Sequence, residues 1–87
     1  MTTRQEQYER ASRVMPGGVN SSTRLNKAIG TPFFASRAQG SHVWDIEGRE
    51  FIDMCCGHGS ALLGHGHPAV TEGLSQASAR GYLNAFE

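Results

Sequence analysis

The pattern of apolar and polar positions predicts two helices on either side of a small antiparallel sheet. Apolar residues recur at helical spacing over 5–15, and a polar loop follows over 16–31. Over 32–54 the period changes to two, which predicts three short strands joined by tight turns as a meander. A glycine-rich loop over 55–67 leads into a second helix over 68–80. We therefore expect a segment made of a helix, a three-stranded antiparallel meander and a helix.

The apolar positions of these elements indicate where a core would form. In the meander, the second and third strands each carry a pair of adjacent large apolar side chains, and in the second helix an apolar stripe follows the helical period. The residues expected in the core of the meander are Val43, Trp44, Phe51 and Ile52, and those of the helical stripe are Val70, Leu74 and Ala77. Asp45 and Asp53 could suggest paired carboxylates for acid–base chemistry.

Composition limits how well this chain can form a core of its own. Ile, Leu, Val and Phe make up 16 of its 87 residues, which is few for a globular domain. Eight basic and eight acidic residues are dispersed, without the basic stripe of a nucleic-acid-binding protein. The first ten residues lack the apolar centre of a signal peptide, and no stretch approaches a membrane span. We expect a cytoplasmic chain without nucleic-acid or membrane partners, whose marginal core would gain stability from a partner or from a larger body of protein.

Candidate metal ligands and thiols give a weak signal. Cys55 and Cys56 are adjacent, so two free thiols are favoured over a strained disulfide between neighbours. His65 and His67 are separated by one residue, and neither pair has the ligand spacing typical of zinc sites. The sequence therefore predicts no metal site.

Four motifs, in register along the chain, resemble one enzyme family. These are the run from Met15 to Arg24 (Met-Pro-Gly-Gly-Val-Asn-Ser-Ser-Thr-Arg), Trp44-Asp45-Ile46-Glu47-Gly48, Phe51-Ile52-Asp53, and Gly64-His65-Gly66-His67-Pro68. Together they are similar to the amino-terminal segment of the class III pyridoxal-phosphate (PLP) aminotransferases. The Pro-Gly-Gly-Val-Asn-Ser run is most similar to the glutamate-1-semialdehyde aminomutase branch.

The resemblance implies a fold, a cofactor and an activity for a longer protein. The complete enzyme would be an α/β, fold-type I homodimer with a large cofactor domain, and it would transfer an amino group between an amino acid and an oxo acid or aldehyde. PLP would be bound by residues beyond this chain, so no cofactor-binding or catalytic residue is assigned here. Because Lys27 is the only lysine and sits in a polar loop, we expect no transamination by the 87 residues alone. Their contribution would be substrate recognition and dimer contacts.

Within this segment the resemblance implies three substrate-binding residues: Arg24, Ser21 and His58. A guanidinium can bind the substrate carboxylate through two parallel hydrogen bonds, whereas a solvated loop arginine is the alternative for Arg24. Ser21 could donate to a substrate oxygen, or it could serve a turn. The similarity also places Tyr82, Asn84 and Phe86 near the substrate entrance. For Asp45 at a turn and Asp53 at a strand end, it implies a structural role in preference to acid–base chemistry.

His58 is where the sequence departs from typical aminomutases, which carry a tryptophan at this place in the glycine-rich loop. An imidazole could line a polar or aromatic pocket, or simply meet water. The Gly57-His58-Gly59 run favours an aminotransferase acting on another amino acid, and leaves glutamate-1-semialdehyde aminomutase itself as an alternative. A non-catalytic homologue that acts as a partner module is the other alternative. Neither the amino donor and acceptor nor the stereochemistry follows from the residues.

Overall fold

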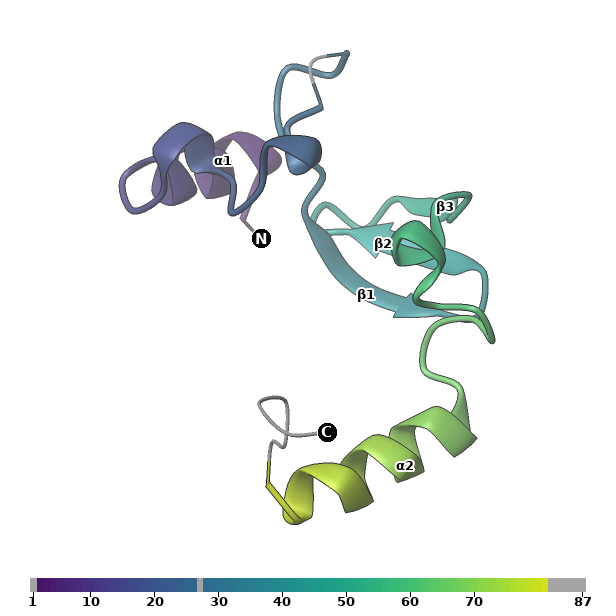
Figure 1. The fold of residues 1–87 in the computed structure, drawn as a ribbon. Coiled ribbons are helices and arrows are strands. Elements are labelled where there is room, and N and C mark those ends of the chain that lie inside the picture. Colours follow the sequence, from purple (N-terminus) through teal and green to yellow (C-terminus); the bar gives the residue numbers. More distant parts are fainter. Residues whose placement is uncertain (1, 27, 82–87) are drawn as a thin grey trace.

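The computed structural model describes residues 2–26 and 28–81, and its elements follow the predicted order (Figure 1). A three-stranded antiparallel sheet of order β1-β2-β3 lies between two α-helices along the chain, which confirms the predicted architecture of the segment. The elements are α1 (Arg4–Ser12), η1 (Pro16–Gly18), η2 (Ser22–Arg24), β1 (Ala35–Gln39), β2 (His42–Asp45), β3 (Glu50–Ile52), η3 (Cys56–Gly59) and α2 (Pro68–Ala79).

Helix α1 begins at a capping box and ends before the predicted residue 15. The Thr3 hydroxyl accepts from the Glu6 amide at 3.1 Å, and the Glu6 carboxylate accepts from the Thr3 amide at 2.8 Å. A residue that precedes proline is disfavoured in the helical region, and Met15 is extended with φ −136° and ψ 134°. The chain therefore leaves the helix after Ser12 and passes through a turn into η1.

The meander is built on two tight turns in which glycine takes a positive φ. Gly40 (φ 58°) follows β1 and Gly48 (φ 84°) precedes β3, a backbone region that costs glycine little. The register pairs Val43 with Ala38 on one side and with Phe51 on the other. Both strand pairs are antiparallel, as a meander of three consecutive strands requires.

Helix α2 stands apart from the other elements (Figure 1). Its first residue is Pro68, and the Nδ1 atom of His67 accepts from the Ala69 amide at 3.2 Å as the N-cap. Within the described residues α2 contacts neither the sheet nor α1, and none of its residues is buried. The predicted apolar stripe is present in sequence but is not covered.

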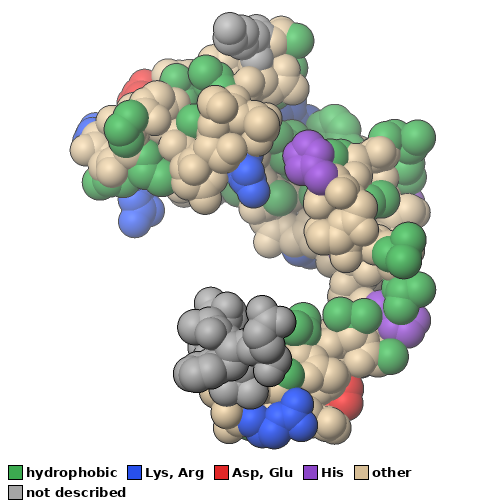
Figure 2. Space-filling view, in the orientation of Figure 1, with side chains coloured by type: hydrophobic (Ala, Val, Ile, Leu, Met, Phe, Trp, Pro, Cys, Tyr) green, Lys and Arg blue, Asp and Glu red, His purple; other side chains and the backbone are tan. Residues whose placement is uncertain are grey.

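The large apolar side chains of the meander are less buried than expected. Val43 and Trp44 are half-buried, but Phe51 is 42% exposed and Ile52 is 57% exposed, so the prediction that these two form a core is wrong for this chain. Ala11 and Pro32 are buried, but no large aliphatic or aromatic side chain of the described residues is. The radius of gyration is 15.5 Å, against about 12 Å for a compact domain of this length. A sheet buries its apolar face only against a second layer, which the described residues do not supply. Figure 2 shows apolar side chains at the surface over the sheet and along α2.

Candidate functional site

The loop over residues 15–24, here called the N-loop, is packed against α1 at one glycine. Gly18 is buried and has φ 72°. A Cβ atom at this position would lie 2.7 Å from Cε2 of Tyr8 and 2.9 Å from the Ser12 hydroxyl oxygen. The backbone of the N-loop therefore approaches α1 more closely than any other residue type would allow.

The N-loop presents Arg24 at the edge of a hollow. Arg24 ends η2 and is exposed, and the hollow beside it has a volume of about 190 Å³. Its other lining residues come from the N-loop and from the segment before β1, and they include Val19, Pro32, Phe33 and Phe34. Among the described residues, no carboxylate forms an ion pair with the Arg24 guanidinium. The hollow thus combines an available cation with apolar walls, which suits an anionic group on an organic molecule.

Ser21 is half-buried and its hydroxyl is engaged locally. The Oγ atom lies 2.9 Å from Oγ1 of Thr23, and either hydroxyl can be the donor. Since a hydroxyl has one hydrogen to donate and two lone pairs, this contact leaves Ser21 with further hydrogen-bonding capacity. Ser21 is not among the residues that line the Arg24 hollow.

The glycine-rich loop holds His58 in an unusual backbone conformation. Both Cys56 (φ 51°) and His58 (φ 58°) adopt the left-handed region, which residues with a Cβ seldom occupy. The His58 side chain is exposed, and its Nδ1 atom lies 3.8 Å from Sγ of Cys55. Both cysteines are free thiols, as predicted. Non-glycine residues in this region persist where the surrounding structure holds them, often at functional sites.

Asp53 forms hydrogen bonds with residues near both ends of the glycine-rich loop. Its Oδ1 atom accepts from the amides of Cys55 and Cys56, both at 2.9 Å. Its Oδ2 atom lies 2.5 Å from Nε2 of His65 at the far end of the loop. The hydrogen bond with His65, followed by those from the Cys56 and Cys55 amides, lowers the pKa of Asp53 to about 2. From the sequence, a structural role is expected for Asp53, and His65 is a candidate only for a metal site, so the contact between the two is not predicted.

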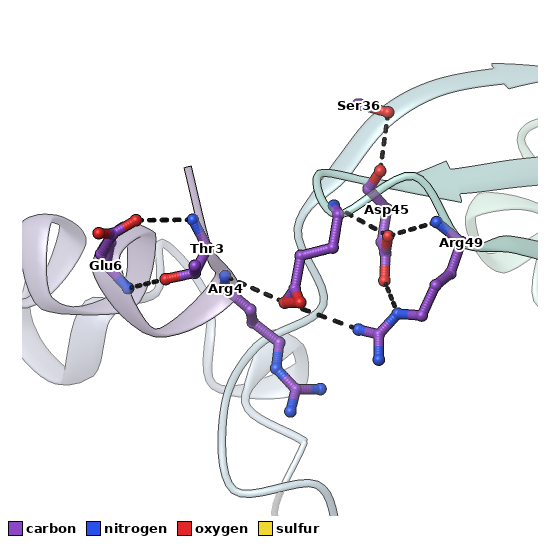
Figure 3. Close-up of polar contacts among 7 residues, drawn as sticks. Thr3, Arg4, Glu6, Ser36, Asp45 and Arg49 are labelled. Atoms are coloured by element: carbon purple, nitrogen blue, oxygen red, sulfur yellow. Dashed lines mark hydrogen bonds and ion pairs between the residues drawn. The ribbon is translucent and has the colours of Figure 1, made fainter. Parts of the chain in front are cut away.

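Asp45 holds the turn between β2 and β3 through its carboxylate, and Glu47 of the same turn contacts the first residue of α1 (Figure 3). Its Oδ1 atom accepts from the amides of Glu47 (3.0 Å) and Arg49 (2.8 Å), and the Arg49 guanidinium donates to Oδ2 at 2.6 Å. Burial disfavours the charged Asp45 carboxylate, but these hydrogen bonds outweigh it and hold its pKa below the ordinary value. The Arg4 amide donates to the Glu47 carboxylate at 3.1 Å. Asp45 is thus a turn-forming residue.

A second hollow, of about 400 Å³, opens between the start of α1 and the sheet. Arg4 and Arg49 line it together with Phe33 and Phe51. Sequence reasoning did not single out this hollow, because its walls come from segments more than forty residues apart in the chain. It contains none of the three predicted substrate-binding residues.

The three predicted residues are not gathered into one site by the described part of the chain. No hydrogen bond or ion pair joins Arg24, Ser21 or His58 to one another among residues 2–26 and 28–81. The positions predicted at the substrate entrance, Tyr82, Asn84 and Phe86, lie outside the described residues.

Comparison with known proteins gives the family. The sequence profile of the family described as Aminotransferase class-III matches residues 25–87, more than half of the chain. The chain belongs to this family. Among curated relatives, the glutamate-1-semialdehyde 2,1-aminomutase of Leptothrix cholodnii is 49% identical over 78 residues. The match covers 88% of this chain and 18% of that relative, so the chain spans less than a fifth of its length.

Solved structures agree with this assignment. An omega-transaminase from Sphaerobacter thermophilus is 31% identical with a TM-score of 0.78, and the match covers 92% of this chain and 18% of that one. A transaminase with PLP bound is 31% identical with a TM-score of 0.75, covering 93% of this chain and 19% of that one. The fold of this segment is therefore the fold of the corresponding part of class III transaminases.

The class III assignment raises the question of whether this segment can hold PLP. That cofactor is held covalently by a lysine amine, and the one lysine of the sequence, Lys27, lies outside the described residues. The described residues therefore contain no lysine that could hold PLP covalently. Within the same residues no cluster of three candidate ligands could hold a metal ion, and no helix has the length and apolar character to cross a membrane.

Proposed function

We propose that this chain is the amino-terminal, substrate-recognition part of a PLP-dependent class III aminotransferase or aminomutase. The enzyme would transfer an amino group between an amino acid and an oxo acid or aldehyde. When bound by the rest of the enzyme, PLP would supply the electron sink for this chemistry. Family membership supports the reaction class, and the observation that carries the role of this segment is the exposed Arg24 beside an apolar hollow.

Arg24 has the chemistry required for the carboxylate of an amino acid substrate. Its guanidinium presents parallel donors that match two carboxylate oxygens, and no carboxylate of the described residues neutralises it. The apolar lining from Phe33 and Phe34 would contact a substrate side chain and exclude water around the ion pair. We assign the clamp to Arg24, and we assign substrate contacts to Ser21 and His58 from their place in the two loops.

Kinetics of the full-length enzyme test this function. The wild-type enzyme loaded with PLP should transfer an amino group from an amino acid to an oxo acid or aldehyde. In Arg24→Ala the KM for the amino donor should rise on the order of a hundredfold, since a charge-assisted bidentate contact is worth about 3 kcal/mol, while PLP absorbance stays unchanged. Arg13→Ala, which removes an exposed arginine of the turn after α1, is the matched control and should leave KM unaltered. A KM unchanged by Arg24→Ala would remove Arg24 from the substrate site.

The aminomutase reaction is a second candidate for the same enzyme. The relative from Leptothrix cholodnii favours it through 49% identity. Turnover of glutamate-1-semialdehyde, compared with a panel of amino donors at equal enzyme concentration, distinguishes internal migration from transfer. If the protein catalyses neither reaction with PLP bound, the result would favour a non-catalytic homologue that acts as a partner module.

We also propose that the uncovered apolar surface of this segment packs on the rest of the enzyme and across a homodimer interface. The side chains concerned are exposed on α2, after β3 and in the glycine-rich loop, namely Leu74 (65%), Met54 (90%) and Leu62 (88%). Exposed apolar patches of this kind usually mark a contact surface. The intact mass of the protein from its native source gives the length of the whole chain, and its native mass gives the number of subunits. A native mass equal to one chain would exclude the dimer.

A further inference from the structure

The glycine-rich loop is closed at both ends by a single carboxylate. Asp53 precedes the loop and holds its first amides, those of Cys55 and Cys56, through Oδ1 at 2.9 Å. Its other oxygen holds the Nε2 atom of His65, twelve positions further along the chain, at 2.5 Å. The side chains of Asp53 and His65 are 16% and 26% exposed, so this contact is largely shielded from water. The residues between them form a loop whose two ends cannot separate without breaking a charge-assisted contact.

The backbone fixes the same closure independently. His65 and Gly40 form an isolated antiparallel bridge, with the Gly40 amide donating to the His65 carbonyl at 2.9 Å and the His65 amide donating to the Gly40 carbonyl at 2.8 Å. Gly64 (φ 84°) lies against this turn, and a Cβ there would come within 3.1 Å of Cα of Gly40. The end of the loop is therefore docked on the β1–β2 turn as well as on Asp53.

Within the closed loop, the backbone of His58 is in the left-handed region, which is unfavourable for a residue with a Cβ. His58 has φ 58°, and among the described residues its side chain has one polar contact, with Sγ of Cys55 at 3.8 Å. A left-handed residue persists where its surroundings determine it. Here the His58 amide donates to the Cys55 carbonyl at 3.1 Å, and the Ala61 amide donates to the Cys56 carbonyl at 3.0 Å. Cys55 and Cys56 are in turn held through their amides by Asp53, so the turn that carries His58 starts from the closed end of the loop.

We propose that Asp53 and His65 are positioning residues, which fix the conformation of the His58 loop and so set the selectivity of the enzyme among amino donors. This inference rests on the proposed function, because it assigns a determinant of substrate choice within the same site. His65 acts through the loop and does not touch the substrate. The ligand would be an amino acid that donates the amino group, and His58 would contact the side chain of this donor.

Substitution of the two neighbouring histidines provides a matched test in the full-length enzyme with PLP bound. His65→Asn removes the contact with Asp53, whereas His67→Asn keeps a side chain well suited to the N-cap of α2. The ratio of kcat/KM between two amino donors of different side chain should fall about tenfold in His65→Asn and remain unchanged in His67→Asn. Unaltered selectivity in both variants would overturn the proposal.

A double-mutant cycle separates positioning from general loss of structure. If His65 acts through His58, then His65→Asn should not reduce donor selectivity any further in a His58→Ala background. An equal loss of selectivity in the presence and absence of the His58 side chain would show that His65 acts by another route, and would refute its role as a positioning residue.

Hydrogen exchange tests the closure without reference to activity. Amides of residues 54–64 should exchange at least tenfold faster in His65→Asn than in the wild type or His67→Asn. Gly64→Ala, which drives a Cβ against Gly40, should give the same increase. Gly66→Ala carries the same cost of a positive φ (68°) but no clash, because nothing lies within 4 Å of a Cβ there, so its increase should be clearly smaller. Unchanged exchange would overturn the closure whatever the enzyme turns over. Faster exchange in an enzyme without transaminase or aminomutase activity would instead retain the closure, refute its role in selectivity and count against the proposed function.

Discussion

The close approach of the N-loop to α1 makes Gly18→Ala a sharp test of the structure. Gly17 and Gly18 are neighbours with nearly the same backbone conformation, φ 68° and φ 72°. A Cβ at Gly17 would meet only a methyl of Val19 at 4.0 Å, whereas a Cβ at Gly18 would lie 2.7 Å from the Tyr8 ring. The two alanine variants therefore share the conformational cost and differ in the steric clash.

The expected magnitudes follow from these two contributions. Alanine in the left-handed region costs about 1 kcal/mol relative to glycine, and this cost applies to both variants. Overpacking at a contact that cannot relax costs about 1–3 kcal/mol. The half-buried Tyr8 ring can move away only by giving up its own packing. We expect the free energy of opening of the α1–η1 unit to fall by about 1 kcal/mol in Gly17→Ala and by about 3 kcal/mol in Gly18→Ala.

Native-state hydrogen exchange of the full-length protein measures this opening directly. The informative amides are those of α1 and of Gly18, which donates to the Met15 carbonyl at 2.9 Å. In a Tyr8→Ala background the excess cost of Gly18→Ala over Gly17→Ala should fall, since the clash with the ring is gone and only the contact with the Ser12 hydroxyl, 2.9 Å from the Cβ, remains. Equal destabilisation by the two glycine substitutions in the presence of Tyr8 would refute the packing of the N-loop on α1.

Three further predictions concern the helix cap, acid stability and substrate choice. Thr3→Ala should lower the free energy of opening of α1 by about 1 kcal/mol, measured by exchange of its first-turn amides, because it removes the side chain that accepts from the Glu6 amide. Asp53 has its pKa lowered to about 2 in the folded protein, from an ordinary value of 3.8. The ionised Asp53 therefore stabilises the folded protein above pH 4, and this stabilisation is lost as the pH falls toward 2. The Tm of the wild type should exceed that of Asp53→Asn by less and less over that interval. A difference in Tm that stays constant with pH would contradict the role of the Asp53 charge. His58→Trp should change the relative kcat/KM values across a panel of amino donors, and identical ratios would argue against contact between His58 and the substrate.

Local chemistry explains why much of the fold could be predicted from sequence. Helix α2 begins at Pro68 because proline suits a first helical turn, and the turns at Gly40 and Gly48 need a positive φ that glycine provides. The period of two in the pattern of apolar and polar residues over 32–54, together with these turns, predicts the meander. The end of α1 was placed too late, since helical periodicity continues to Met15 whereas the steric effect of Pro16 acts on the residue before it.

The candidate site was only partly predictable. The role of Arg24 stays a prediction: its residue type suits a substrate carboxylate, and its place in the loop carries that role by family resemblance. The contact between Asp53 and His65 joins side chains twelve positions apart and depends on the path of the loop between them, so no local pattern reveals it. The prediction of a core at Phe51 and Ile52 is wrong for a different reason. These neighbours in β3 lie on opposite faces of the sheet, and each face is buried only against a second layer, which a local sequence pattern cannot place.

The sequence alone thus determined the order of helices and strands, the turns and the family resemblance, all of which depend on residue type and spacing within a few positions. Only the tertiary structure decided that Gly18 packs on Tyr8, that the carboxylate of Asp53 closes the His58 loop, and that α2 leaves its apolar stripe uncovered. These features arise where distant segments meet in space, and their energies come from contacts that do not exist until the chain has folded.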